Sequence, residues 1–476
     1  MALALAAGVS ALSTTSDSGS EGFKASARST AHAVVDRRPY PRTLSFAKCG
    51  YDAELAKRDM VVGAAYCDIA KLRKLDPNGI FLVQPGLFPG SGGNGYGGMS
   101  VTYGAGLYYW RPGYTWPNNG CDNLPGGVAL GCIRAFDPNY DWLRSADGQI
   151  VRKNGASGPP GWNLADPTGK GTRELVAKFM AYTAKLDGLY AKGWDGVFSD
   201  NWIYGVIGAT YFYGSRLDTD RDGKVDDYTT LRKQWDDGLN EVASRLQSYL
   251  PGKLVVGNGN LTAARTYYGG DPTGWLKSAN GTMVEAIERY YNSPAALLNL
   301  SSRWLDFGDG SEQPRYLLYL QNALTDSGQL FTGGAGADPN DSKLMLDPAV
   351  MRSMRWGFTL ALMSGAYYEI VLNNDHGVRW WYDEYDGGLG IRRRGYLGLP
   401  RGDMKRLLAD VYRRDFQHGI AINNSSRRAV TVKLRSRYRH LRGTQDTRVN
   451  NGKLVTQVTV PAHDGVVLVD VGRRSK

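Results

Sequence analysis

Eight short apolar segments recur over residues 40–372, and segments with helical spacing separate most of them. The apolar segments are residues 43–49, 60–66, 80–84, 194–200, 253–258, 281–286, 315–321 and 366–372. Runs of this kind are typical of strands buried on both faces of a parallel sheet. The pattern predicts an α/β fold, a (β/α)8 TIM barrel. A doubly wound sheet is the alternative, but no Gly-x-Gly-x-x-Gly follows the first strand.

Amphipathic helices are expected between these strands. The clearest lie over residues 172–192 and 229–250, and others are expected near 293–305 and 348–364. In the helix over 229–250 one face carries only large apolar side chains, namely Leu231, Trp235, Leu239, Val242 and Leu246. A long excursion rich in Gly, Tyr and Trp, residues 86–165, separates the third strand from the fourth.

The hydrophobic period changes to two near the C-terminus. After a helix expected over 402–413, apolar and polar residues alternate in four short segments divided by Gly, Asn and Ser, namely 418–424, 429–434, 453–460 and 465–471. This alternation predicts a small antiparallel β-sandwich. We therefore expect a leader and linker over 1–38, a barrel over 39–400, and a helix plus β-sandwich over 401–476.

The N-terminal residues 1–12, MALALAAGVSAL, resemble the apolar part of a secretory signal without its basic start. They favour export to the extracellular space or the cell envelope. The chain has four cysteines and no Cys-x-x-Cys, so we expect disulfides, which form in oxidising compartments. Of the three pairings, Cys49 with Cys67 and Cys121 with Cys132 is the one we expect.

Positive charge is concentrated near the C-terminus. Residues 391–476 contain 20 Lys and Arg against 6 Asp, a net charge of +14, whereas the whole chain carries +11. Such a surface could contact acidic polymers or could simply be solvated. No recognition helix or stacking sheet is evident, so no specific nucleic-acid partner is expected. Beyond the N-terminal segment, no run approaches the roughly 18 apolar residues of a membrane span.

Polar residues close the strands or follow them closely, where a TIM barrel has its active site. They are Lys48, Tyr66, Gln84, Asp200, Asn258, Glu285, Gln321 and Asp375. Asp200 and Glu285 are the carboxylates that end strands four and six. A pair of carboxyl groups is what glycosidic-bond hydrolysis requires, one as acid and one as nucleophile or base. The structural alternatives are a loop cap for Asp200 and an arginine ion pair for Glu285.

Aromatic residues gather in the loops beyond the strands, where rings could stack on sugars or simply pack the loops. Hydrogen-bonding side chains accompany them at the strand ends. The expected substrate-binding residues are Tyr66, Gln84, Trp110, Trp162, Asn201, Trp202, Asn258, Gln321, Asp375, Trp380 and Asp386.

The segment DTDRDGKVDD, residues 218–227, matches the first half of an EF-type calcium loop. Asp218, Asp220 and Asp222 precede Gly223, and Asp226 or Asp227 could add an oxygen. Thr229 stands at the twelfth position, where such loops have Glu. The loop could bind a structural calcium ion or could be a solvated acidic turn. We expect the reaction itself to require no cofactor.

Three segments carry a family resemblance. WDGVFSDNW (194–202), WWYDEYDGGLG (380–390) and the tail RDFQHGIAINNSS…VTVPAHDGVVLV resemble the hypothetical glycosyl hydrolase family fifteen, a set of TIM-barrel proteins, over about residues 40–470. The chain is more loosely similar to retaining α-galactosidase and polygalactosaminidase-type barrels. That resemblance implies a nucleophile at Asp200 and an acid/base at Glu285, where the α-galactosidase group often has Asp.

These observations predict a secreted glycoside hydrolase that cleaves an O-glycosidic bond with two carboxylates and retains configuration. A non-catalytic carbohydrate-binding protein on a degenerate barrel is the main alternative. A lyase or transglycosylase acting on an acidic polysaccharide is another.

Overall fold

The computed structural model describes most of the chain from residue 36 onward. The described residues are 36–46, 50–63, 67–84, 100–103, 107–109, 143–151, 193–199, 216–258, 279–306, 315–334, 337–372 and 379–471, with scattered positions over 166–184. No helix among them is long and apolar enough to cross a membrane.

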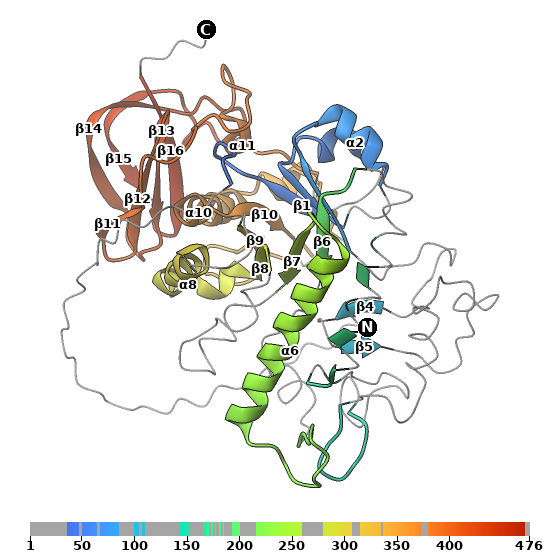
Figure 1. Cartoon of the computed structure of the whole chain (residues 1–476). Helices are drawn as coiled ribbons and strands as arrows, with labels where there is room; N and C mark the ends of the chain where they lie inside the picture. Colours follow the sequence, from blue (N-terminus) through green and yellow to red (C-terminus); the bar gives the residue numbers. More distant parts are fainter. Residues whose placement is uncertain are drawn as a thin grey trace, which may run out of the picture. The chain divides into compact units, whose positions relative to one another are not determined.

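Eight parallel strands form the main sheet (Figure 1). In sheet order they are β1 (Leu44–Phe46), β2 (Met60–Val62), β3 (Ile80–Val83), β6 (Gly196–Ser199), β7 (Leu254–Asn258), β8 (Gly281–Glu285), β9 (Tyr316–Asn322) and β10 (Tyr367–Val371). A parallel bridge between Thr43 and Tyr368 joins the first strand to the last. The predicted barrel and all eight of its strands are confirmed.

Helices follow most of the strands. They are α1 (Asp52–Leu55), α2 (Ile69–Leu75), α6 (Tyr228–Tyr249), the 3₁₀ helix η4 (Ile287–Tyr290), α8 (Pro294–Asp306), α9 (Ser342–Met345) and α10 (Pro348–Ser364). The Asp227 carboxylate accepts the N–H of Thr230 and caps α6. Asp347 caps α10 in the same way, with Pro348 in its first turn.

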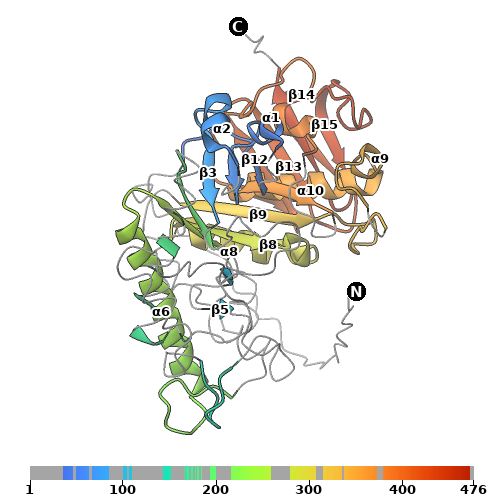
Figure 2. The same ribbon diagram turned by 90° about the vertical axis from the view of Figure 1, so that its right-hand side faces the viewer.

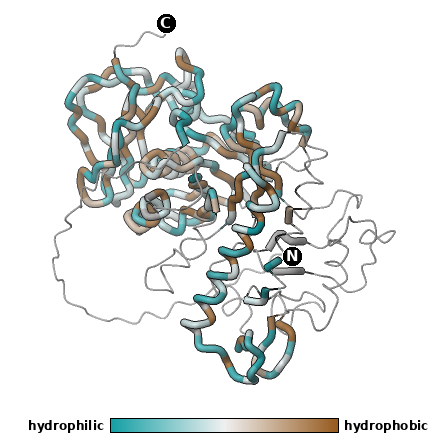
Figure 3. Tube along the Cα trace, viewed as in Figure 1, coloured by the Kyte–Doolittle hydropathy of each residue, from teal (hydrophilic) through white to brown (hydrophobic). Residues whose placement is uncertain are grey.

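The apolar faces predicted for these helices are buried. On α6, Leu231, Trp235, Leu239, Val242 and Leu246 are each at most 3% exposed, and Figure 3 shows polar and apolar positions mixed along this helix. The described positions of the helix expected over 172–192 are helical at 173, 174, 177, 180, 181 and 184. The expected excursion contains the antiparallel strands β4 (Ser100–Tyr103) and β5 (Leu107–Tyr109).

Six antiparallel strands form a separate C-terminal sheet (Figure 2). They are β11 (Lys405–Leu408), β12 (Val411–Phe416), β13 (Gly419–Asn424), β14 (Val430–His440), β15 (Leu454–Val460) and β16 (Asp464–Asp470), in the order β11-β12-β13-β16-β14-β15. Side chains from β12 to β16 enclose a second apolar cluster that includes Ile422, Val432, Val458 and Leu468. The predicted antiparallel β-structure is confirmed.

The helix expected over 402–413 is wrong, because this segment is the β11–β12 hairpin. Leu407, Leu408, Val411 and Tyr412 have helical spacing, but Asp410 has a φ of 56° and turns the chain back. Asp tolerates this left-handed conformation better than most residues. Pairing of β12 with β13 then outweighs the local helical pattern.

The C-terminal sheet packs on α10 through a buried ionic group. The Arg355 guanidinium donates to both carboxylate oxygens of Asp464, at 2.8 and 2.9 Å, and to Asp446 at 2.9 Å. Asn423 of β13 donates to the backbone oxygen of Trp356 at 2.9 Å. These contacts hold the sheet against the barrel's helical layer.

Candidate active site

The ends of β7 and β8 bring two of the predicted site residues together. Asn258 Nδ2 donates to Glu285 Oε2 at 2.7 Å. Asn258 pairs in register with Met283, two residues before Glu285, so both side chains lie on the same face of the sheet. Glu285 is partly exposed and forms no salt bridge within the described part of the chain. This arrangement does not support the arginine-pair alternative.

The backbone directly after Glu285 is strained. Ala286 has φ 62° and ψ 53°, a left-handed conformation that costs a residue with a Cβ roughly 1–2 kcal/mol. It redirects the chain from β8 into η4. Such conformations persist only where the surroundings impose them, and they are common at functional sites.

Glu288 of η4 holds this turn against the end of β9, and we did not predict it from the sequence. Its carboxylate accepts the backbone N–H and the Nδ2 of Asn322, both at 3.0 Å. Burial raises the pKa of Glu288, and the hydrogen bonds from Asn322 oppose that shift. Glu288 therefore fixes the segment that carries Glu285.

Glu369 of β10 is a second acidic residue that we did not predict. It pairs in register with Leu320, as Glu285 does from the other side, so both carboxylates lie on the face of the sheet that Leu320 occupies. Glu369 accepts hydrogen bonds from Ser45 Oγ at 3.0 Å and from the N–H of Phe46 at 3.2 Å. Burial raises its pKa to about 8, against the opposing charge of Arg58.

Gln321, which the sequence analysis predicts as a substrate-binding residue, lies on the opposite face of β9. Its Nε2 donates to the backbone oxygen of Ser353 at 3.0 Å and to Ser353 Oγ at 2.7 Å, and its Oε1 accepts the Tyr368 hydroxyl at 2.7 Å. The side chain is fully buried against α10. This placement makes Gln321 a link between the barrel and its helical layer.

The other described residues of the predicted binding set differ in role. Gln84 is partly exposed directly after β3, close to Gly63, which follows β2. The backbone oxygen of Trp380 accepts Arg58 Nη2 at 2.7 Å, and the residue as a whole is partly exposed. Asp386, at the end of α11 (Asp383–Asp386), accepts Trp381 Nε1 and the N–H of Gly388, both at 3.0 Å. Its carboxylate thus stabilises the α11 turn.

The remaining predicted site residues lie outside the described residues. They are Tyr66, Trp110, Trp162, Asp200, Asn201, Trp202 and Asp375. Cys49, Cys121 and Cys132 also lie outside them. Cys67 is disulfide-bonded, and the pairing with Cys49 stays a prediction.

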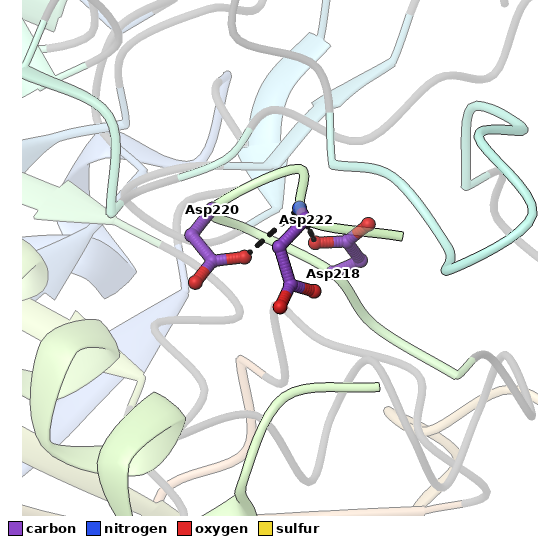
Figure 4. Close-up of side chains that lie close together, drawn as sticks. All are labelled: Asp218, Asp220 and Asp222. Carbon is purple, nitrogen blue, oxygen red and sulfur yellow. Dashed lines mark hydrogen bonds between the residues drawn. The ribbon is translucent and has the colours of Figure 1, made fainter. Parts of the chain in front are cut away.

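The acidic loop between Leu217 and Asp227 brings three of the four predicted calcium ligands together (Figure 4). Asp218, Asp220 and Asp222 can place carboxylate oxygens within 4.8 Å of one another. The N–H of Asp222 lowers the pKa of Asp220, but burial and the neighbouring carboxylates outweigh it and the net shift is upward. Asp226 instead accepts the N–H and hydroxyl of Thr219, both at 2.7 Å. The three carboxylates are grouped as the first half of a calcium loop requires, but Lys224 Nζ already donates to Asp222 at 2.9 Å. Calcium binding at this loop stays a prediction.

Several solved structures of glycoside hydrolases are similar to this chain. The glycoside hydrolase domain of PelA from Pseudomonas aeruginosa is 14% identical, with a TM-score of 0.31 over 61% of this chain and 86% of that one. An alpha-amylase from Lactobacillus plantarum is 11% identical, with a TM-score of 0.42 over 88% of this chain and all of that one. A GH36 alpha-galactosidase from Geobacillus stearothermophilus is 10% identical, with a TM-score of 0.39 over 91% of this chain and 56% of that one.

At these TM-scores the likenesses carry no argument about this chain. A search of curated proteins found no match. The family model described as hypothetical glycosyl hydrolase family 15 matches residues 176–420, more than half of the chain. This range includes β6 to β10 and the Asn258–Glu285 pair. The chain therefore belongs to the hypothetical glycosyl hydrolase family 15, and it is a glycoside hydrolase by family.

Proposed function

We propose that the chain hydrolyses an O-glycosidic bond in an oligo- or polysaccharide with retention of configuration. The observation that carries the proposal is the hydrogen bond from Asn258 to Glu285 at the ends of β7 and β8. It orients a partly exposed carboxyl group at the rim of a barrel where no described cation neutralises it. Asp200, directly after Ser199 at the end of β6, is the proposed nucleophile.

In the first step Asp200 attacks the anomeric carbon while Glu285 gives its proton to the leaving oxygen. The C–O bond to the leaving group breaks as the bond to Asp200 forms, which yields a glycosyl ester. In the second step Glu285 takes a proton from water, the water oxygen bonds to the anomeric carbon, and the Asp200 ester bond breaks. Asn258 keeps Glu285 Oε2 occupied, so Oε1 is the atom we assign to proton transfer.

The test separates the two roles. Asp200→Asn is expected to abolish release of reducing ends at unchanged melting temperature. Glu285→Gln is expected to abolish cleavage of substrates with poor leaving groups but to retain cleavage of dinitrophenyl glycosides, which need no protonation. Asp237→Asn, on the exposed face of α6, is the matched control and should keep full activity.

NMR of the first-formed product anomer reports on retention. A retaining enzyme has its two carboxyl groups about 5–5.5 Å apart and an inverting one about 6.5–9.5 Å apart. An inverted product would overturn the nucleophilic role of Asp200. Sugar binding by the wild type with no release of reducing ends would favour a non-catalytic binding protein.

We also propose that the chain works outside the cytoplasm, at the cell envelope or beyond it. The disulfide at Cys67 supports this, because disulfides persist in oxidising compartments. Thiol labelling of the protein from each cell fraction tests it. Recovery of reduced protein in the cytoplasmic fraction alone would contradict it.

A further inference from the structure

The β14–β15 hairpin carries an uncompensated positive charge. Residues 430–460 contain seven Lys and Arg and one acidic residue, Asp446. Asp446 is 5% exposed, accepts Arg355 Nη1 at 2.9 Å and accepts Arg448 Nε at 3.1 Å. Because Asp446 is occupied by Arg355 and Arg448, no carboxylate of the hairpin remains to neutralise the other exposed cations.

A bulge presents these cations to solvent. Lys433 pairs with Gln457 and Tyr438 with Val455, so β14 has three more residues than β15 between these two pairs. Arg435, Ser436 and Arg437 in this stretch are all exposed. A bulge twists a strand and re-aims its side chains. We name the exposed cations Lys433, Arg435, Arg437, Arg439 and Arg442 the basic strip.

No residue of the basic strip forms a salt bridge with the described residues. Arg439 Nη1 donates to the backbone oxygen of Gly452 at 3.0 Å, which leaves its charge uncompensated. Each guanidinium can donate several hydrogen bonds in a planar fork that matches a carboxylate or sulfate. The strip is therefore built to receive anions spaced along an extended chain.

The neighbours of the strip carry hydroxyl and amide groups. Gln457 is exposed opposite Lys433, and the hydroxyls of Thr431 and Thr459 lie 2.8 Å apart on the same pair of strands. The exposed side chains of β14 and β15 include no aromatic ring, whereas proteins that bind single-stranded nucleic acid stack bases on such rings. Cations mixed with hydroxyl and amide groups favour a ligand with both anionic groups and hydroxyls.

The loop that follows β14 also contacts the segment beyond the last barrel strand. The Asp383 carboxylate accepts the N–H groups of Thr444 and Gln445, at 2.8 and 3.0 Å. Gln445 Nε2 donates to the backbone oxygen of Trp381 at 2.8 Å. The basic strip thus continues through residues 441–445 to the aromatic residues that follow β10, beside the barrel.

We propose that the basic strip binds an anionic polysaccharide and that the substrate of the barrel is such a polymer. This inference rests on the proposed glycosidase function and names its substrate class. The strip would hold the acidic chain by its carboxylate or sulfate groups while the barrel cleaves a nearby linkage.

The experiment measures binding of the full chain to polygalacturonate, with dextran as the neutral probe. The double variant Arg435→Ser/Arg437→Ser should bind polygalacturonate about tenfold more weakly, with a smaller dependence on salt. Arg427→Ser/Arg428→Ser removes the same charge from an exposed turn of the same sheet, outside the strip, and should bind like the wild type. Both variants replace exposed side chains, and their unfolding curves should match that of the wild type.

Equal loss of binding in both double variants would overturn the binding role of the basic strip, because the change in net charge alone would explain the loss. Equal affinity for dextran, or tighter binding to duplex DNA or to phosphatidylserine vesicles than to polygalacturonate, would overturn the polysaccharide assignment. Binding is compared between chains that all carry Asp200→Asn, so the polymer is not cleaved during the measurement. Inactivity of the barrel with intact strip binding would count against the glycosidase proposal alone.

Discussion

Buried ionisable side chains form salt bridges in one part of the molecule and lack them in another. At the contact between α10 and the C-terminal sheet, Arg355 satisfies Asp464 and Asp446 with three hydrogen bonds of 2.8–2.9 Å. In the barrel, Glu369 is 1% exposed and has no salt bridge among the described residues. Glu288 likewise relies on the neutral Asn322.

The difference shows in the pKa values. Burial lowers the pKa of Arg355, but the charge of Asp464 and its hydrogen bonds outweigh it, so the net shift is upward and the group stays ionised. Burial instead raises the pKa of Glu369 to about 8. The ion pairs of Arg355 hold two layers together, whereas the carboxyl group of Glu369, which only the charge of Arg58 opposes without a salt bridge, keeps its proton near neutral pH.

The largest expected effect is on stability, from breaking the compensated group. Arg355→Met leaves Asp464 buried without a salt-bridge partner and leaves Asp446 with Arg448 alone, which should cost about 3–5 kcal/mol of unfolding free energy. Chemical denaturation measures this. Arg352→Met, one turn earlier in α10 and paired with the exposed Asp326, should cost about 1 kcal/mol or less. Equal losses in the two variants would contradict the comparison.

The second prediction concerns pH. The pKa of Glu369 rises from 4.5 to about 8 on folding, so the folded state binds the extra proton between these values. Stability should therefore fall as pH increases through this window, by about 1.4 kcal/mol per unit. Glu369→Gln should remove that slope, which denaturation midpoints at pH 6 and 7.5 would show. Asp237→Asn on exposed α6 should keep the slope.

A smaller effect is expected at the strained residue. Ala286→Gly relieves the left-handed strain but adds freedom to the unfolded chain, for a net gain of about 1 kcal/mol. Because Glu285 is then held less firmly, kcat should fall severalfold. Asp410→Gly, at another positive-φ residue, in the β11–β12 hairpin, should leave kcat unchanged. An unchanged kcat in Ala286→Gly would show that the strain has no catalytic use.

The smallest effect is expected from calcium at the acidic loop, where three carboxylates lie close together and Lys224 pairs with Asp222 alone. For a dissociation constant of about 1 mM, 2 mM calcium should stabilise the fold by about 0.6 kcal/mol. Asp218→Asn should abolish this gain, since Asp218 is the buried member of the three aspartates. Magnesium at the same concentration is the control, because it demands a stricter geometry. A calcium effect that survives Asp218→Asn would place the ion elsewhere.

The strands could be predicted from the sequence because each is an apolar run with clear ends. The β11–β12 hairpin could not, since Leu407 and Leu408 beside Val411 imitate a helix face. In the structure Leu408 is 56% exposed, and pairing of β12 with β13 decides the conformation. Tertiary pairing of this kind leaves no local signal.

The candidate site was predictable only in part. Asn258 and Glu285 end their strands, and that position identified them. Glu369 lies inside the apolar segment AYYEIVL, and a single acidic residue within a buried strand is the sequence signal that marks it. The role of Glu288 depends on Asn322, 34 residues away, so only the folded chain reveals it.

Closure of the barrel has a consequence for biosynthesis. Ser45 and Glu369, which meet where the first and last strands join, are 324 residues apart in the sequence. During translation the early strands therefore keep an unpaired edge until most of the chain has left the ribosome. Contacts of such long range slow folding, and unpaired strand edges promote aggregation in the interval. We expect the nascent protein to depend on chaperones until β10 has been synthesised.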